Sequence, residues 1–83
     1  MQKHLIFGVH LTNRLTQAVE VQRLFTSYGS HIKTRLGLHD VELTQPSGLI
    51  LLEMYGDERE CHEFAEKLKA IVGVEVQSMS FTD

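Results

Sequence analysis

The chain has 83 residues, which is enough for one domain and too few for a second hydrophobic core. Eight basic and eleven acidic residues give a formal net charge of −3, whereas a self-sufficient nucleic-acid-binding protein usually carries a basic surplus on one face. The one cysteine cannot form a disulfide within the chain, and the longest apolar run, residues 49–52, is far too short for a membrane span. Because the first residues also lack the apolar segment of a signal peptide, we expect a cytoplasmic protein with no membrane association.

The first half predicts a strand, a helix and a second strand. Strict alternation over residues 4–11 is typical of a strand with one buried face. Thr12 and Asn13 can cap a helix, which apolar residues at spacings of three and four predict over residues 14–28. This stripe consists of Leu15, Ala18, Val21, Phe25 and Tyr28. We expect Gly29 to close the helix in a left-handed conformation, before a strand over residues 32–38.

The second half repeats this plan after a predicted loop over residues 39–47. Residues 48–55 are apolar on both faces, as in a central strand. A strong apolar stripe predicts a helix over residues 58–72, closed by Gly73, and residues 74–81 predict the last strand.

Two β-α-β units in tandem, each too small to bury its own apolar face, predict one α+β domain over residues 1–83: a ferredoxin-like βαββαβ two-layer sandwich. Right-handed crossovers place both helices on one face of a four-stranded antiparallel sheet, with the first and third strands central. The other face should expose more apolar groups than a monomer usually does, among them Ile6, Leu51, Met79 and Phe81. A second copy of the chain is the expected cover, which predicts a homo-oligomer.

Five histidines raise the question of a metal site. His4 and His10 lie six residues apart on one strand, or about 20 Å, so they cannot share an ion within one chain. No set of soft donors has the close spacing of a metal site, and we predict none within one chain. A site shared between subunits through His10 or His39 stays open as an alternative.

Catalysis is not expected. Cys61 falls in the apolar stripe of the second helix, beside glutamates that raise a thiol pKa, and therefore resembles a core residue rather than a nucleophile. The chain has no evident serine–histidine–acid arrangement and no phosphate-cradling glycine loop. We predict a protein that is not an enzyme and has no cofactor.

The second predicted strand contains a candidate binding element. Glycine weakens a strand unless a backbone or ligand approaches it closely. Alternation places Arg35 and Gly37 on the bare sheet face near Gly8, where the guanidinium could hold a carboxylate or phosphate. Alternatively, the glycines admit a partner sheet and Arg35 pairs with Glu53 or Glu75.

The first strand–helix turn offers the other half of this candidate site. Asn13 and the free amides at the helix start attract carboxylates, and His10 lies just before the turn. We predict that His10, Asn13, Arg35 and Gly37 bind a small anionic or amino-acid-like effector at a subunit interface, with Arg35 supplied by the adjoining subunit. Alternatively, Asn13 merely caps its helix and Arg35 makes an intersubunit ion pair.

Three segments carry a family resemblance: Ile-Lys-Thr-Arg-Leu-Gly-Leu at residues 32–38, the apolar strand at residues 49–54, and Glu-Lys-Leu-Lys-Ala-Ile-Val-Gly-Val-Glu-Val-Gln-Ser at residues 66–78. Together they resemble the iron-only hydrogenase system regulators, which are small, stand-alone ferredoxin-like proteins related to ACT domains. The resemblance implies an ACT-like fold and a cytoplasmic accessory or sensor protein. ACT-like domains commonly bind effectors between subunits, which agrees with the site predicted above.

Residues 62–67 and 73–76 are also similar to the regulatory domain of nickel-responsive repressors. Those domains bind nickel through a strand histidine pair and a nearby cysteine, but this chain has Leu36, Gly37 and Leu38 at the corresponding place. The likeness therefore extends to the fold and not to nickel or DNA binding.

These observations together predict a non-enzymatic regulatory or sensor module that works as a dimer or tetramer. One alternative is a structural or partner-binding protein that adds a strand at an exposed sheet edge. The other is a metal-responsive regulatory domain.

Overall fold

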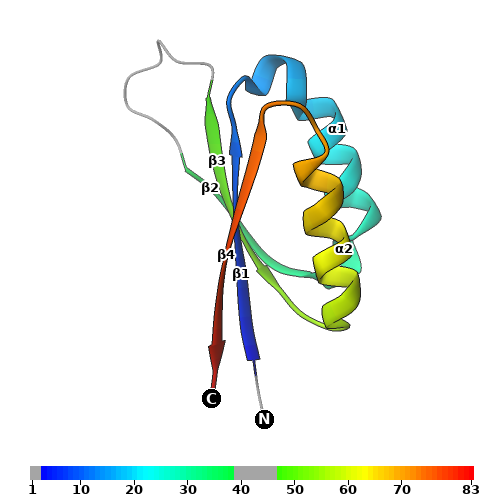
Figure 1. Cartoon of the computed structure of the whole chain (residues 1–83), viewed down its shortest axis with the longest axis vertical. Coiled ribbons are helices and arrows are strands. Elements are labelled where there is room, and N and C mark those ends of the chain that lie inside the picture. The colour runs from blue at the N-terminus through cyan, green and yellow to red at the C-terminus, as the bar shows by residue number, and fades with distance from the viewer. Residues whose placement is uncertain (1–2, 39–46) are drawn as a thin grey trace.

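The computed structural model describes residues 3–38 and 47–83. Its elements, in chain order, are β1 (Lys3–Leu11), α1 (Arg14–Ser27), a short 3-10 helix (Gly29–His31), β2 (Ile32–Leu38), β3 (Gly48–Met54), α2 (Glu58–Lys69) and β4 (Val74–Thr82). Figure 1 shows both helices on the same side of the sheet, with the start of β1 beside the end of β4, where Lys3 pairs with Thr82. Most of the predicted loop, including His39, lies outside the described residues.

The strand order is β2-β3-β1-β4, with all neighbours antiparallel. The prediction of a ferredoxin-like βαββαβ sandwich with β1 and β3 in the centre is therefore confirmed. Alternate residues of β1 contact the helices, and the burial of its side chains follows this alternation closely.

The hydrophobic core lies between the sheet and the helices. Its centre is Phe64 of α2, whose ring centroid lies 6.3 Å from that of Phe7, 6.0 Å from that of Phe25 and 4.9 Å from that of Tyr28. The apolar stripe of α2 is buried as predicted, through Cys61, Phe64, Ala65 and Leu68. Fully burying a leucine or phenylalanine side chain contributes about 1.5–3 kcal/mol, so Phe64 and Leu68 in particular hold α2 on the sheet.

The predicted stripe of α1 is wrong at its first residue, because Leu15 is 80% exposed. Gln17 is buried there instead. Its Nε2 donates to Thr12 Oγ1 at 3.2 Å and to the Val72 carbonyl at 2.8 Å, while its Oε1 accepts from the Asn13 amide at 3.1 Å. Gln17 therefore joins the start of α1 to the turn before β4.

The predicted role of Gly29 is also wrong. The chain continues from α1 into the 3-10 helix, and the glycines with positive φ among the described residues are Gly56 and Gly73. The prediction that Gly73 closes the second helix is wrong as well, because α2 ends at Lys69 with Ala70 as its C-cap. Gly73, with a φ of +83°, lies instead in the following turn, where the Val74 amide donates to the Ile71 carbonyl at 3.0 Å.

Strand β2 contains the feature that most changes the predicted surface. Its pairing with β3 is regular except for a register shift between Ile32 and Thr34. One additional residue in a strand turns every later side chain to the opposite face of the sheet. After the shift, Leu36 pairs with Leu51 on the open face, while Arg35 pairs with Leu52 on the helical face.

Candidate functional site

The sheet face opposite the helices carries the largest set of exposed apolar side chains. Leu36, Leu38, Leu49 and Leu51 lie side by side on β2 and β3, and we call them the leucine cluster. The first three are 53%, 44% and 38% exposed. A second group, Met79 and Phe81 on β4, pairs with Ile6 and His4 of β1 on the same face.

The two apolar groups lie at diagonally opposite corners of this open face. The strand registers place Lys33 and Glu53 at the third corner and His10 and Glu75 at the fourth. Gly8 lies between the two groups, paired with Leu51 on one side and Gln77 on the other. The open face is therefore apolar along one diagonal and charged along the other.

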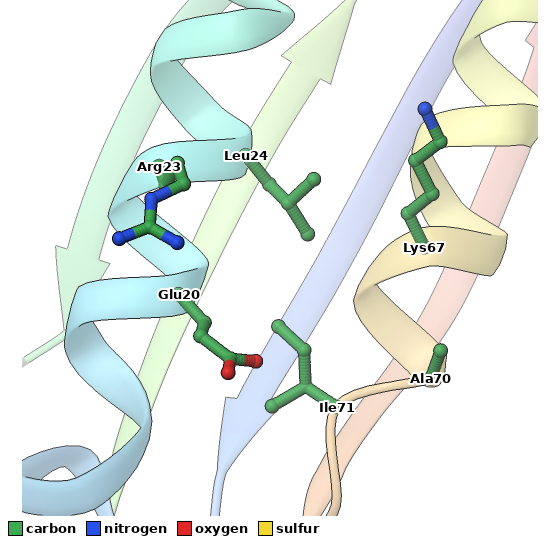
Figure 2. A pocket seen from close by; sticks show the side chains of 6 residues that line it. All are labelled: Glu20, Arg23, Leu24, Lys67, Ala70 and Ile71. Carbon is green, nitrogen blue, oxygen red and sulfur yellow. The ribbon is translucent and has the colours of Figure 1, made fainter.

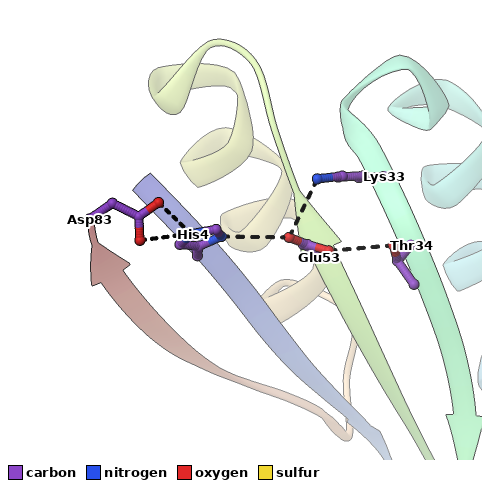
Figure 3. Close-up of polar contacts among 5 residues, drawn as sticks. All are labelled: His4, Lys33, Thr34, Glu53 and Asp83. Atoms are coloured by element: carbon purple, nitrogen blue, oxygen red, sulfur yellow. Dashed lines mark hydrogen bonds and ion pairs between the residues drawn. The ribbon is translucent and has the colours of Figure 1, made fainter. Parts of the chain in front are cut away.

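Figure 3 shows the polar contacts that join Lys33 and Glu53 to His4, Thr34 and Asp83. His4 Nε2 lies 3.1 Å from Asp83 Oδ2, and its Nδ1 lies 3.8 Å from Glu53 Oε2. The same Glu53 oxygen lies 3.9 Å from Lys33 Nζ, and Thr34 Oγ1 donates to its other oxygen at 3.4 Å. Since these groups are partly exposed, each pair contributes little to stability, but together they fix the charge pattern of the face.

The four predicted effector-site residues do not meet within one subunit. His10 lies on the open face, with its Nδ1 3.7 Å from Glu75 Oε1. Asn13 caps α1, and its side chain accepts from the Leu15 amide at 3.1 Å. The prediction that Arg35 and Gly37 lie on the open face is wrong, because the register shift places both on the helical side.

Arg35 and Gly37 instead line a hollow between α1 and the β2–β3 edge of the sheet, which we call the α1–β2 pocket. Its volume is about 230 Å³. Arg35 Nη1 donates to Gln22 Oε1 at 3.1 Å, and the guanidinium lies over the Phe25 ring. Arg14 at the start of α1 supplies the second cation. The lining residues are Leu11, Arg14, Ala18, Val21, Gln22, Arg35, Gly37, Leu38, Gly48, Leu49 and Ile50.

Sequence reasoning missed Arg14 and Gln22 as members of this pocket. Both lie in the helix facing β2, and their relation to Arg35 depends on the register shift. No residue pattern in the chain signals that shift, so only the three-dimensional structure brings the three together.

A second hollow of about 320 Å³ lies between the two helices. Figure 2 shows Leu24 and Ile71 on its two sides, with the Glu20 carboxylate directed into the gap. Lys67 lies on the opposite wall, 5.2 Å from the centroid of the Tyr28 ring, and its hydrogen bond with Tyr28 raises the pKa of Lys67. This hollow therefore combines both signs of charge at an exposed surface.

Cys61 is 1% exposed, and its Sγ lies 3.6 Å from the Tyr55 carbonyl. Burial raises the pKa of its thiol, and the nearby Asp57, Glu58 and Glu60 act in the same direction. Because the thiolate is the nucleophilic form, Cys61 is poorly suited to catalysis. Across residues 3–38 and 47–83, no group of three histidine, cysteine or acidic side chains is arranged to hold a metal ion.

No family model and no curated protein matches the sequence. Among solved structures, the uncharacterized protein TM1266 from Thermotoga maritima has a TM-score of 0.84 and 22% identity, covering 98% of this chain and 100% of that one. A dimeric ferredoxin-like protein from an uncultured marine organism has a TM-score of 0.56 and 8% identity, covering 95% and 92%.

A formyltetrahydrofolate deformylase from Pseudomonas putida KT2440 has a TM-score of 0.58 and 17% identity, covering 92% of this chain. The match spans only 28% of the deformylase. At these identities the likenesses show the ferredoxin-like fold alone. Among the described residues, no helix is long and apolar enough to cross a membrane.

Proposed function

We propose that the protein is a non-enzymatic regulatory or sensor module that acts as a homo-oligomer assembled through its open sheet face. The leucine cluster is the observation that carries this proposal. Its side chains, with Met79 and Phe81, form a more apolar face than the sequence predicted, because the register shift adds Leu36 and Leu38 to it. Exposed apolar surfaces of this kind usually mark an interface.

The distribution of charge favours a second copy as the partner. A two-fold axis in the plane of the face, directed from the leucine cluster to Phe81, would pack each apolar group against its own copy. The same rotation would bring Lys33 of one subunit opposite Glu75 of the other, and His10 opposite Glu53. Such self-complementarity is the requirement of an isologous dimer interface. A solved protein of the same fold is described as dimeric, which supports a homodimer without indicating which face forms it.

More specifically, the proposed regulatory role belongs to the iron-only hydrogenase system. The family resemblance of residues 32–38, 49–54 and 66–78 supports this assignment. An effector bound between subunits would act by stabilising one arrangement of the oligomer over another. The absence of catalysis is supported by Cys61, since the only thiol in the chain is buried with a raised pKa.

Sedimentation at micromolar concentration, compared between wild type and Leu51→Asp, tests the assembly. A carboxylate at the centre of the face should convert the oligomer to a folded monomer, because it would be buried without a partner. Leu15→Asp on the exposed side of α1 is the matched control and should leave the oligomer intact. A wild-type monomer, or equal effects of the two substitutions, would contradict the proposal.

Native mass spectrometry after incubation with amino acids, nucleotides and divalent metals tests the sensor function. A bound small molecule that changes the oligomer supports it. Retention of nickel or zinc alone would favour a metal-responsive domain, and no response to any of these compounds would favour a partner-binding protein.

A further inference from the structure

We propose that the α1–β2 pocket binds a small carboxylate that has an apolar body and no ammonium group. The pocket is formed within one subunit, so this inference goes beyond the proposed assembly and does not depend on it.

The charge of the pocket selects an anion. Arg14 and Arg35 approach it from two different elements, and none of the described residues that line it is acidic. A ligand carboxylate can pair with either guanidinium, and such charge-assisted hydrogen bonds are among the strongest in proteins. A ligand ammonium would instead face two cations, with no acceptor carboxylate among the described lining residues. The pocket should therefore discriminate against a zwitterion of the same shape.

Arg35 is held in a defined position for this role. Its Nη1 donates to Gln22 Oε1 at 3.1 Å, and its guanidinium carbon lies 4.8 Å from the centroid of the Phe25 ring. A guanidinium has five N–H donors, so one hydrogen bond leaves others for a ligand. Because contacts within the chain already orient the group, binding loses less side-chain entropy.

The walls of the pocket select an apolar body of limited size. Its hydrophobic lining comes from both layers, with Leu11 and Ile50 on the sheet and Ala18 and Val21 on α1. A Cβ atom added at Gly37 would find no atom of the described residues within 4 Å, so the glycine leaves open space beside Arg35. The volume of about 230 Å³ is below the roughly 300 Å³ at which pockets for drug-sized ligands begin. A short branched or aromatic acid matches this space.

The hollow between the helices is a weaker candidate for such a ligand. Its lining includes Glu20 together with Arg23 and Lys67, so it offers an anion a repulsive carboxylate.

Titration calorimetry with 4-methylpentanoate and with free leucine tests the proposal, because the two share a carbon skeleton and differ by the ammonium group. We expect 4-methylpentanoate to bind at least about tenfold more tightly, because the ammonium group of leucine would lose its hydration beside two cations without gaining a hydrogen-bond acceptor of opposite charge. Arg35→Ala should weaken binding by a similar factor. Gly37→Val should do so by filling the open space without changing any charge.

Arg23→Ala, which removes an arginine from the other hollow, is the matched control and should bind like the wild type. Circular dichroism verifies the fold of each variant, and Gly37→Val keeps the test valid if Arg35→Ala fails to fold. Equal affinity for the two ligands, no binding at millimolar concentration, or unchanged affinity in Gly37→Val would overturn the proposal. The Leu51→Asp variant should bind 4-methylpentanoate like the wild type, because the pocket lies within one subunit. The binding test and the assembly test can therefore fail independently.

Discussion

The guanidinium carbon of Arg35 lies 4.8 Å from the centroid of the Phe25 ring, which joins edge strand β2 to helix α1. Among the described strands, β2 has only β3 as a neighbour, so its contacts with α1 add a second attachment. The hydrogen bond from Arg35 to Gln22 reinforces this attachment. The residue predicted to bind a ligand on the open face thus holds together the two layers around the α1–β2 pocket.

Arg35→Lys should lower the free energy of unfolding by about 0.5–1 kcal/mol, the range for a partly exposed cation–π contact. Lysine keeps the charge but loses the planar group that stacks on Phe25 and donates to Gln22. Urea denaturation followed by circular dichroism measures the change. Arg23→Lys, on the same helix as Phe25, should change stability by less than half as much, and equal effects would contradict the structural role given to Arg35.

The side of the sheet on which Arg35 lies could not be predicted from the sequence. The two tandem β-α-β units, the central strands and the stripe of α2 follow from hydrophobic periodicity, which is a property of each segment alone. The face on which Arg35 lies depends on one register shift between Ile32 and Thr34. Such a shift depends on pairing between strands that are distant in the sequence, so alternation within β2 could not reveal it. The pocket around Arg14 and Arg35 was unpredictable for the same reason.

Gly73→Ala should destabilise the protein by more than 1 kcal/mol, about the cost of forcing an ordinary residue into a left-handed conformation. Its φ is +83°, and an added Cβ would lie 2.6 Å from Thr12 Oγ1. The substitution would therefore also disturb the hydrogen bonds of Gln17 with Thr12 and Val72. Thermal unfolding measures the loss.

Gly29→Ala is the matched control for this prediction. A Cβ at Gly29 would find no atom within 4 Å, and its backbone does not have positive φ. Alanine there should leave stability unchanged or raise it by about 0.4–1 kcal/mol through the unfolded state. A larger loss at Gly29 than at Gly73 would contradict the backbone conformations observed at the two glycines.

Lys33→Glu should weaken the homo-oligomer by up to about 1 kcal/mol per contact, the upper range for exposed ion pairs. The two-fold arrangement places Lys33 opposite Glu75 of the other subunit, so the reversed charge would repel it. Glu75→Lys alone should also weaken the oligomer, and the double variant with both charges reversed should restore association. Sedimentation equilibrium at low and moderate salt measures these differences. A double variant that associates no better than either single variant would exclude this two-fold axis.

At alkaline pH, the change in the free energy of unfolding with pH should depend on Cys61. Burial is the main cause that raises the pKa of this thiol above its ordinary value of 9.0, and nearby Asp57, Glu58 and Glu60 add to the effect. The folded protein thus holds the thiol proton more tightly than the unfolded chain does. The resulting stabilisation is fully present below pH 9 and is lost as the pH rises through the folded-state pKa.

Cys61→Ala should be less stable than the wild type at pH 7.5, because it removes a sulfur that is buried in the core. The difference should narrow above about pH 9, since alanine has no proton to lose, whereas the wild type must then either retain a buried thiol proton or bury a charge. Urea midpoints measured from pH 7.5 to 10.5 under reducing conditions give this difference directly. Lys67, whose pKa is raised by Tyr28, titrates in both proteins, so its contribution cancels in the comparison. If the stability difference between wild type and Cys61→Ala stays constant or widens as the pH rises, the Cys61 thiol ionises at least as easily in the folded protein as in the unfolded chain.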